Sequence, residues 1–248
     1  MALLQVQELT KQFGGLTACN GVSVDIEAGE IVGLIGPNGA GKTTLFNCIA
    51  GYYQINGGKV IFDGKEISNL PPNEICRLGI ARTFQVVRIF KDMTVMDNLM
   101  VGGFVRTLNT RRVRQDALEV LNFTGLAAKK DMLGGALTIA DKKRLEIARA
   151  LMTGPRLLML DEAMAGLTQT ETQQALEIIH KLHKQKITMF LVEHVMEVIM
   201  PISSRVLVLE YGKKIAEDVP EKIIYNDDVI KAYLGEKYHA MRQGKEGK

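Results

Sequence analysis

The sequence predicts an α/β fold with a mixed sheet core, an antiparallel β part and a helical part. Three observations support this prediction. A glycine-rich, phosphate-binding sequence at residues 36–43 follows an apolar run at residues 31–35 and precedes a helical pattern. The segments on both sides of this region alternate apolar and polar side chains, as half-buried strands do. Beyond residue 156, strand-like runs alternate with a helical stretch, which is typical of a parallel sheet.

The N-terminal quarter of the chain carries strand patterns. Residues 3–9 and 22–26 alternate in polarity, and residues 27–30 form a turn into the apolar run before the glycine-rich loop. Residues 59–62 read as a further strand that ends in the turn Asp63-Gly64. We expect these strands to pair in antiparallel fashion, which departs from the βαβ rhythm of a plain doubly wound sheet.

The middle of the chain is predicted to be mostly helical. Residues 71–78 begin with two prolines and form a short helix, and residues 80–84 form a buried strand that reaches Gln85. From about residue 94 to residue 151 the pattern is helical, with apolar side chains every three or four positions in residues 111–122 and 142–151. Thr94 with Asp97 resembles a capping box, although the box prefers Glu or Gln at its last position. This block is the candidate second lobe.

Strand character returns at residues 157–160, 188–192 and 206–209, with a helix at about 170–184. We therefore expect one domain over residues 1–235. Its core lobe comprises residues 1–85 and 152–235, and its helical lobe comprises about 86–151. Residues 236–248 are polar and read as a C-terminal tail.

Composition excludes several classes of protein. The net charge of +3 is small, and no basic stripe interleaves with aromatic residues, so nucleic acid is not an expected partner. The three cysteines lie far apart, which argues against a zinc knuckle or a disulfide framework. Gln5, Gln7 and Glu8 interrupt the apolar start, so we expect no signal peptide. No apolar run approaches the roughly 18 residues that a bilayer span needs, so a role at a membrane requires docking onto other chains.

The glycine-rich loop carries the strongest chemical signal. Residues 36–43 read Gly-Pro-Asn-Gly-Ala-Gly-Lys-Thr, which matches the phosphate-binding pattern G-x-x-x-x-G-K-[ST]. Glycine amides and the following helix N-terminus would surround the β-phosphate, Lys42 would reach the β- and γ-phosphates, and Thr43 would ligate Mg²⁺. The residues predicted to bind ATP here are Gly36, Asn38, Gly39, Ala40, Gly41, Lys42, Thr43 and Thr44.

Two carboxylates follow the predicted strand at residues 157–160. Ligands of open α/β sheets bind at the carboxyl edge, so Asp161 would hold Mg²⁺ through a water and Glu162 would polarise the attacking water. The alternative interpretation is a solvated acidic turn. Gln85, at the end of another strand, could complete the Mg²⁺ shell.

Two further residues are candidates for contact with the nucleotide. His194 ends the strand at residues 188–192 and could lie near the γ-phosphate, although a lone histidine is more often structural. Phe13 could stack on adenine, with a core or turn phenylalanine as the alternative. His180 and His183 lie one helical turn apart among lysines, and we reject a metal site there because no third ligand is evident.

These residues together resemble an ATP-binding cassette (ABC) ATPase over essentially the whole chain. The resemblance rests on the order of the phosphate loop, Gln85, a helical lobe, the run at residues 144–151, Asp161-Glu162, the run at residues 165–167 and His194. The segments 13–16, 81–85, 93–99 and 228–235 resemble the ATPase subunits of branched-chain amino acid importers.

The resemblance implies a dimer. Two such subunits stack head to tail around two ATP molecules, and each site pairs one chain's phosphate loop with the other chain's signature motif, usually LSGGQ. The dimer drives transmembrane permease subunits, and indirectly serves a solute-binding protein, from the cytoplasmic face of the membrane. Residues 85–104 would contact the membrane partner.

The signature motif departs from the family pattern. Leu137-Thr138-Ile139-Ala140-Asp141 puts Thr138 at the usual serine and Ala140 at the second glycine. Ala140 adds a Cβ where a backbone amide should approach a γ-phosphate, and it disfavours a positive φ. An altered signature impairs the partner's ATP site, whereas Lys42, Asp161, Glu162 and His194 are intact here. We therefore hypothesise a heterodimer in which this chain supplies the competent catalytic half. The alternative is a working homodimer.

The sequence thus predicts the ATP-hydrolysing subunit of an importer for branched-chain amino acids or related small polar solutes, such as amides. One alternative is the ATPase of a lipid or lipopolysaccharide exporter. Another is a non-hydrolytic regulatory subunit that binds ATP while its partner works. A cassette that acts on ribosomes or DNA is not favoured, because the chain has neither tandem cassettes nor long coiled-coil arms.

Overall fold

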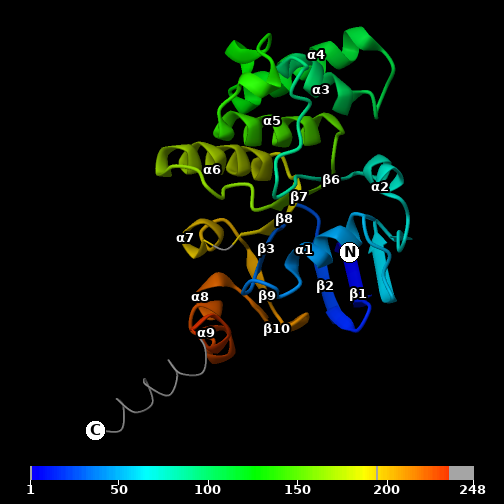
Figure 1. Ribbon diagram of the computed structural model, residues 1–248, viewed down its shortest axis with the longest axis vertical. Helices are drawn as coiled ribbons and strands as arrows, with labels where there is room; N and C mark the ends of the chain where they lie inside the picture. The colour runs from blue at the N-terminus through cyan, green and yellow to red at the C-terminus, as the bar shows by residue number, and fades with distance from the viewer. Residues whose placement is uncertain (1, 194, 235–248) are drawn as a thin grey trace. The chain divides into compact units, whose positions relative to one another are not determined.

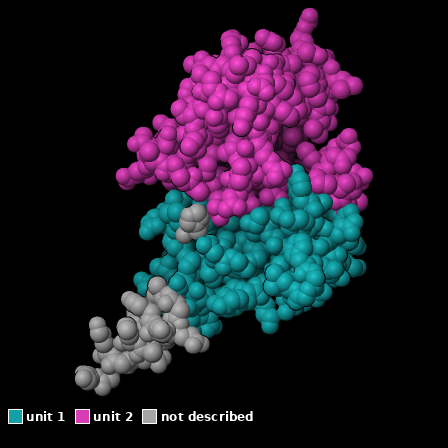
Figure 2. Space-filling model, in the orientation of Figure 1, with its two compact units in different colours: residues 1–69, 190–248 teal, residues 70–189 magenta. Residues whose placement is uncertain are grey.

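The computed structural model describes residues 2–193 and 195–234 (Figure 1). It divides into two compact units, one of residues 1–69 and 190–248 and the other of residues 70–189 (Figure 2). The boundary near residue 190 falls inside β8 (Thr188–Val192), a strand of five buried residues. The lobe bounds expected from the sequence, at residues 85/86 and 151/152, stay a prediction. The predicted tail at residues 236–248 lies outside the described residues.

The first unit contains a four-stranded sheet in the order β2-β1-β4-β5. β1 (Ala2–Phe13) pairs antiparallel with both β2 (Leu16–Glu27) and β4 (Gly57–Phe62), and β4 pairs antiparallel with β5 (Lys65–Glu66). The predicted antiparallel pairing is therefore confirmed. Both β1 and β2 extend well beyond the predicted segments, because their pairing continues to Phe13 and Leu16, past the residues whose polarity alternates.

A second group of strands in this unit holds the phosphate loop. β3 (Ile31–Ile35) is buried along its whole length and pairs in parallel with β9 (Arg205–Glu210), which pairs antiparallel with β10 (Lys213–Asp218). The mixed sheet is thus confirmed. β10 is absent from the sequence prediction because its residues are exposed or half-buried, so no apolar alternation marks them.

Four helices complete the described part of the first unit. α1 (Lys42–Ile49) follows the glycine-rich loop as predicted. α7 (Met196–Ile199), α8 (Pro220–Ile223) and α9 (Asp227–Leu234) were not predicted from periodicity. α7 and α8 are four residues long, too short to show a 3.6-residue period.

The second unit contains the strands that carry the predicted carboxylates. β6 (Ile80–Arg82) pairs in parallel with β7 (Leu157–Asp161), and all five residues of β7 are buried. β6 ends two residues earlier than predicted. α6 (Gln169–Lys184) follows β7 and begins with a capping box in which Thr168 and Glu171 exchange side chain-to-backbone hydrogen bonds.

The predicted helical block is confirmed. It consists of α3 (Val95–Gly103), α4 (Thr110–Thr124) and α5 (Ile139–Met152), with short 3₁₀ turns η1 (Ala127–Lys129) and η2 (Gly134–Ala136); α2 (Pro72–Leu78) precedes the block. Thr94 caps α3 by accepting a hydrogen bond from the Asp97 amide, as predicted. Apolar faces of the three helices form one core that includes Leu99, Leu121 and Leu145. Burial of each such leucine contributes about 1.5–3 kcal/mol.

α3 and α5 approach one another closely. A Cβ on Gly102 would lie 2.5 Å from the carbonyl oxygen of Arg149, so only glycine permits this spacing. Within the described residues, no helix is both long enough and apolar enough to cross a membrane.

Candidate nucleotide-binding and catalytic residues

The glycines of the phosphate loop are required by close backbone approaches. Gly36 has a φ of 151°, and a Cβ there would lie 2.1 Å from the carbonyl oxygen of Leu209. Gly41 has a φ of 100°, and a Cβ there would lie 2.3 Å from the carbonyl oxygen of Ala18. A side chain at either position forces the backbone to move, so the loop conformation depends on both glycines.

The outer part of the loop faces solvent. Asn38, Gly39 and Thr43 are exposed and Thr44 is half-buried, whereas Ala40 is buried. The Ala40 carbonyl accepts a hydrogen bond of 3.0 Å from the backbone N–H of Gly212, which ties the loop to the turn between β9 and β10. The loop is therefore anchored on its inner side and accessible on its outer side.

Lys42 turns its ammonium group back toward the loop. Its Nζ donates hydrogen bonds to the carbonyl oxygens of Gly36 at 2.6 Å and Pro37 at 3.0 Å. Among the described residues, no side chain caps the N-terminus of α1, and its first turn holds no acidic residue. The lysine charge and the partial positive charge of the helix end therefore reinforce each other, and this combination fits the phosphates of ATP.

Phe13 lies at the exposed end of β1, with 42% of its surface accessible. Its ring meets Tyr53 edge-on with centroids 5.2 Å apart, and the Lys11 ammonium lies 4.7 Å from its centroid. The interpretation of Phe13 as a core residue is therefore wrong, because much of its ring is accessible. Tyr53 and Lys11 were not singled out in the sequence, since aromatic and basic residues in turns and at strand ends are common.

Asp161 ends β7 and is fully buried. Its Oδ2 pairs with Nη2 of Arg82 at 3.2 Å, and its backbone N–H donates to Oγ1 of Thr83, also at 3.2 Å. The interpretation of Asp161 as part of a solvated acidic turn is therefore wrong. Arg82 and Thr83 were missed as site residues because they lie within a predicted strand, whose pattern does not reveal which strand lies next to it.

Gln85 and Glu162 lie together. Nε2 of Gln85 donates a hydrogen bond of 3.0 Å to Oε2 of Glu162. Glu162 has a φ of 51°, a left-handed conformation that costs an L-residue about 1–2 kcal/mol. Lys143 holds this turn, because its Nζ donates to the carbonyl oxygens of Glu162 at 3.0 Å and Ala165 at 2.6 Å. Glu162 is half-buried and directly follows the buried strand β7.

The signature segment begins α5. Thr138 is the N-cap residue, and its hydroxyl both accepts from the Asp141 amide at 3.2 Å and donates to Asp141 Oδ2 at 3.0 Å. Ala140 lies in the first helical turn and is buried, with no positive φ. The expected conflict with a positive φ is therefore wrong, because Ala140 is helical and a helix accommodates alanine best of all residues. The effect of its Cβ on the approach to a γ-phosphate stays a prediction.

Asp141 was missed by the sequence analysis. It occupies the position of the usual glutamine of LSGGQ, so the comparison of the two patterns could have revealed it. The carboxylate is buried and forms ion pairs with Lys129 and with Arg144, the latter at 3.1 Å. Burial favours a higher pKa, but the hydrogen bonds from Lys129 and Thr138 and the two positive charges outweigh it, so the pKa of Asp141 lies below its ordinary value. Asp141 is therefore ionised at neutral pH.

The predicted catalytic residue His194 lies outside the described residues. The residue before it, Glu193, is almost completely buried after β8.

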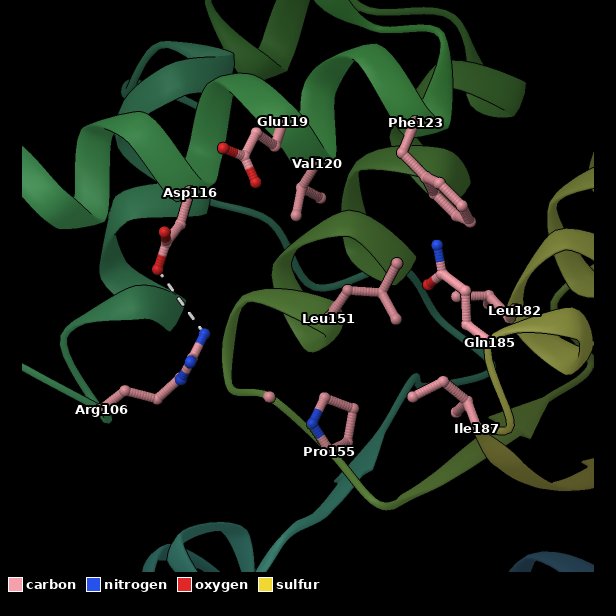
Figure 3. Close-up of a pocket in the computed structure, with 11 residues that line it drawn as sticks. Arg106, Asp116, Glu119, Val120, Phe123, Leu151, Pro155, Leu182, Gln185 and Ile187 are labelled. Carbon is pink, nitrogen blue, oxygen red and sulfur yellow. Dashed lines mark ion pairs between the residues drawn. The ribbon is translucent and has the colours of Figure 1, made fainter. Parts of the chain in front are cut away.

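A separate pocket of about 420 Å³ lies in the second unit (Figure 3). Side chains of Phe123, Leu151 and Leu182 line it, and Arg106 pairs with Asp116 at 3.6 Å on its rim. None of the predicted site residues lines this pocket. It is therefore distinct from the candidate site.

Comparisons with known proteins agree with this geometry. A family model described as ABC transporter matches residues 19–165. BraF of Pseudomonas aeruginosa, a high-affinity branched-chain amino acid transport ATP-binding protein, is 45% identical over 253 residues, which cover 94% of this chain and 98% of BraF. LivG of Escherichia coli K12 has the same description and is 42% identical over 250 residues, which cover 94% and 98% of the two chains.

A solved structure extends this similarity to the fold. The ADP conformation of MJ1267, an ATP-binding cassette of an ABC transporter, has a TM-score of 0.86 and 31% identity to this chain. The match covers 95% of this chain and 100% of MJ1267. The resemblance inferred from the sequence is confirmed: the chain belongs to the ABC transporter family and is one of its ATPase cassettes.

Proposed function

We propose that this chain hydrolyses ATP at the cytoplasmic face of a membrane to drive the import of branched-chain amino acids or related small polar solutes. The likeness to BraF and LivG over nearly the full length of all three chains carries the choice of substrate. The hydrogen bond between Gln85 and Glu162, next to buried Asp161, supports hydrolysis rather than regulatory binding alone.

Different residues of the chain have different roles in the proposed hydrolysis. Lys42 binds the β- and γ-phosphates and balances the charge that develops on the γ-phosphate. Glu162 acts as the base that orients and polarises the attacking water, and we propose His194 as a second group near the γ-phosphate. Mg²⁺ would supply positive charge beside the phosphates of ATP, and Thr43, Gln85 and Asp161 are the residues that would hold it.

Exposed apolar side chains in the segment at residues 85–104 support docking of a membrane partner. Val86, Phe90, Val101 and Phe104 each expose more than a third of their surface within the segment at residues 85–104. Large apolar side chains gathered in one segment of a chain are typical of interaction sites. We propose that a transmembrane permease subunit covers them, and that a solute-binding protein serves the complex from the other side.

The signature segment supports an asymmetric dimer. The hydroxyl of Thr138, which could donate to a γ-phosphate, donates to Asp141 instead. The Asp141 carboxylate also occupies the two nearby cations, Lys129 and Arg144, which could otherwise attract a phosphate to this helix end. The partner's ATP site, which this segment would complete, is therefore weak. We propose a heterodimer in which the partner's signature completes the competent site on this chain.

The substitution Glu162→Gln tests hydrolysis in the complex assembled with the co-expressed partner ATPase. Because the amide cannot act as a base, turnover should fall by about a hundredfold or more, while ATP binding persists. Glu177→Gln, an exposed residue of α6, is the matched control and should leave turnover unchanged. Normal turnover with Glu162→Gln would refute the proposed base.

Steady-state ATP hydrolysis by the purified chain alone, measured over a wide range of protein concentration, tests the asymmetry. A chain that needs its partner's signature should bind ATP but not turn it over at any concentration. Specific activity that rises with concentration and saturates would show a self-sufficient homodimer and overturn the heterodimer.

A further inference from the structure

One face of α5 contacts both segments that carry the predicted catalytic groups. Lys143, Glu146 and Arg149 are spaced three residues apart, which places them along one side of the helix. Lys143 donates to backbone carbonyls in the turn that contains Glu162. Glu146 and Arg149 contact the segment at residues 84–90, which contains Gln85.

The carboxylate of Glu146 holds the backbone on both sides of Gln85. Its Oε1 accepts a hydrogen bond of 3.0 Å from the backbone N–H of Arg88, and the backbone amide of Phe84 also hydrogen-bonds this carboxylate. Gln85 therefore lies within a short loop whose two ends are fastened to one side chain. The other end of the segment is fixed separately, because Asn98 exchanges two hydrogen bonds of 2.9 Å with the backbone of Phe90.

Contacts beside these amides reduce the freedom of the loop further. Arg149 donates a hydrogen bond to the backbone carbonyl of Arg88, whose N–H donates to Glu146. Both backbone polar groups of Arg88 are therefore hydrogen-bonded to side chains of α5. The Phe84 ring has the guanidinium groups of Arg82 and Arg88 each 4.7 Å from its centroid. The backbone around Gln85 is thus fixed while its side chain reaches Glu162.

Burial of the Glu146 carboxylate costs free energy, because the buried charge loses its hydration. Glu146 is 3% exposed, and burial raises its pKa above the ordinary value, although the two amides and the charges of Arg149 and Lys143 oppose that change. A buried carboxylate is tolerated only where hydrogen bonds and opposite charges compensate its lost hydration. An apolar residue would pack in this helix at lower cost, so the core alone does not account for Glu146.

We propose that Glu146 is a positioning residue for Gln85. By fixing the amides of Phe84 and Arg88, it places the Gln85 side chain against Glu162 and within reach of the Mg²⁺ that the proposed function requires. The inference rests on the proposed function in this respect, because Gln85 matters to catalysis only in an ATP-hydrolysing chain.

Hydrogen exchange of the purified chain tests the contact without any nucleotide. With Glu146→Ala, the amides of Phe84 and Arg88 lose their acceptor and should exchange at least about tenfold faster, while amides in the middle of α4 keep their rates. Glu119→Ala, an exposed residue of α4, is the matched control and should leave the two amides protected. Unchanged protection of both amides in Glu146→Ala would overturn the inference.

A double-mutant cycle with Gln85→Ala tests the functional step in the assembled complex. Because a misplaced positioning group can cost about a hundredfold in rate, Glu146→Ala should lower turnover by about ten- to a hundredfold and raise the Mg²⁺ concentration for half-maximal activity. Glu146→Ala should add little to the loss already caused by Gln85→Ala, since both act through one group. Fully additive losses would overturn the inference.

The conservative variant Glu146→Gln keeps the measurement possible if Glu146→Ala does not fold. Its amide oxygen still accepts from one of the two backbone donors, so turnover should fall between that of the wild type and that of Gln85→Ala. Amide protection at Phe84 and Arg88 should be partly lost. A Glu146→Gln protein without any change in protection or turnover would overturn the inference. Loss of activity in Glu162→Gln with normal behaviour of the Glu146 variants would leave the proposed function intact and reject this inference alone.

Discussion

Two helix N-termini in this chain carry opposite electrostatics. α1 begins after Gly41, and among the described residues no side chain caps it and no acidic residue occupies its first turn. α5 begins after Thr138, whose hydroxyl caps the helix, and buried Asp141 occupies its first turn. Both ends present backbone N–H groups, yet at α5 the hydroxyl of the N-cap residue Thr138 already accepts from one of them.

The difference lies in where the negative charge comes from. At α1, Lys42 adds a positive charge beside the helix end, so the loop is complementary to phosphate. At α5, the carboxylate of Asp141 already supplies the anion and is itself neutralised by Lys129 and Arg144. A helix end that carries its own carboxylate gains stability and loses the capacity to bind phosphate.

Removal of the charge at α1 should have the largest effect. With Lys42→Ala, the loop loses its cation and the hydrogen bonds to the carbonyls of Gly36 and Pro37, so turnover should fall by about a thousandfold and nucleotide affinity should fall with it. A fluorescent-nucleotide titration measures the binding. Lys59→Ala, an exposed lysine of β4 that pairs with Glu66 at 3.9 Å, is the matched control. Equal affinity in Lys42→Ala and the control would remove the phosphate role of Lys42.

The backbone shape of the α1 end should matter next. Gly41→Ala puts a Cβ 2.3 Å from the carbonyl oxygen of Ala18, so the loop must move and turnover should fall by about a hundredfold. Gly64→Ala, in the turn between β4 and β5, is the matched control, since a Cβ at Gly64 meets no described atom within 4 Å and carries only the cost of a positive φ, about 1–2 kcal/mol. Steady-state hydrolysis by the two variants measures the difference, and equal losses would mean that φ alone, not the close approach, makes glycine necessary.

The sequence predicted the α1 end well and the α5 end poorly, for a physical reason. The phosphate loop is local: its glycines, lysine and threonine are consecutive, and the flanking strand and helix have clear apolar periods. At α5 the decisive contact joins Asp141 to Lys129, twelve residues apart and in a different element, and no period links the two. The same limit hid Arg82 beside Asp161 and Glu146 beside Arg88, because tertiary contacts between distant segments leave no pattern in a single sequence.

Loss of the charge at α5 should have the smallest effect, with a sign opposite to that at α1. Asp141→Asn removes the charge that holds the Thr138 hydroxyl and leaves Lys129 and Arg144 without their anion, so turnover of the assembled complex should rise by several-fold. The free energy of unfolding at neutral pH should fall by about 1–3 kcal/mol. Denaturant unfolding measures the stability term and its pH dependence.

The pH dependence of this stability difference follows from the lowered pKa of Asp141. A carboxyl group whose pKa is lower in the folded chain stabilises it above its ordinary pKa, near 4, and loses this contribution as the pH falls through the folded value. The gap between the wild type and Asp141→Asn should therefore be full at pH 7 and should close in acid. A difference in unfolding free energy that persists at low pH would mean that Asp141 stabilises the fold through packing rather than charge. Unchanged turnover would mean that its charge does not weaken the partner's ATP site. Either result would make the contrast between the two helix ends one of packing rather than of charge.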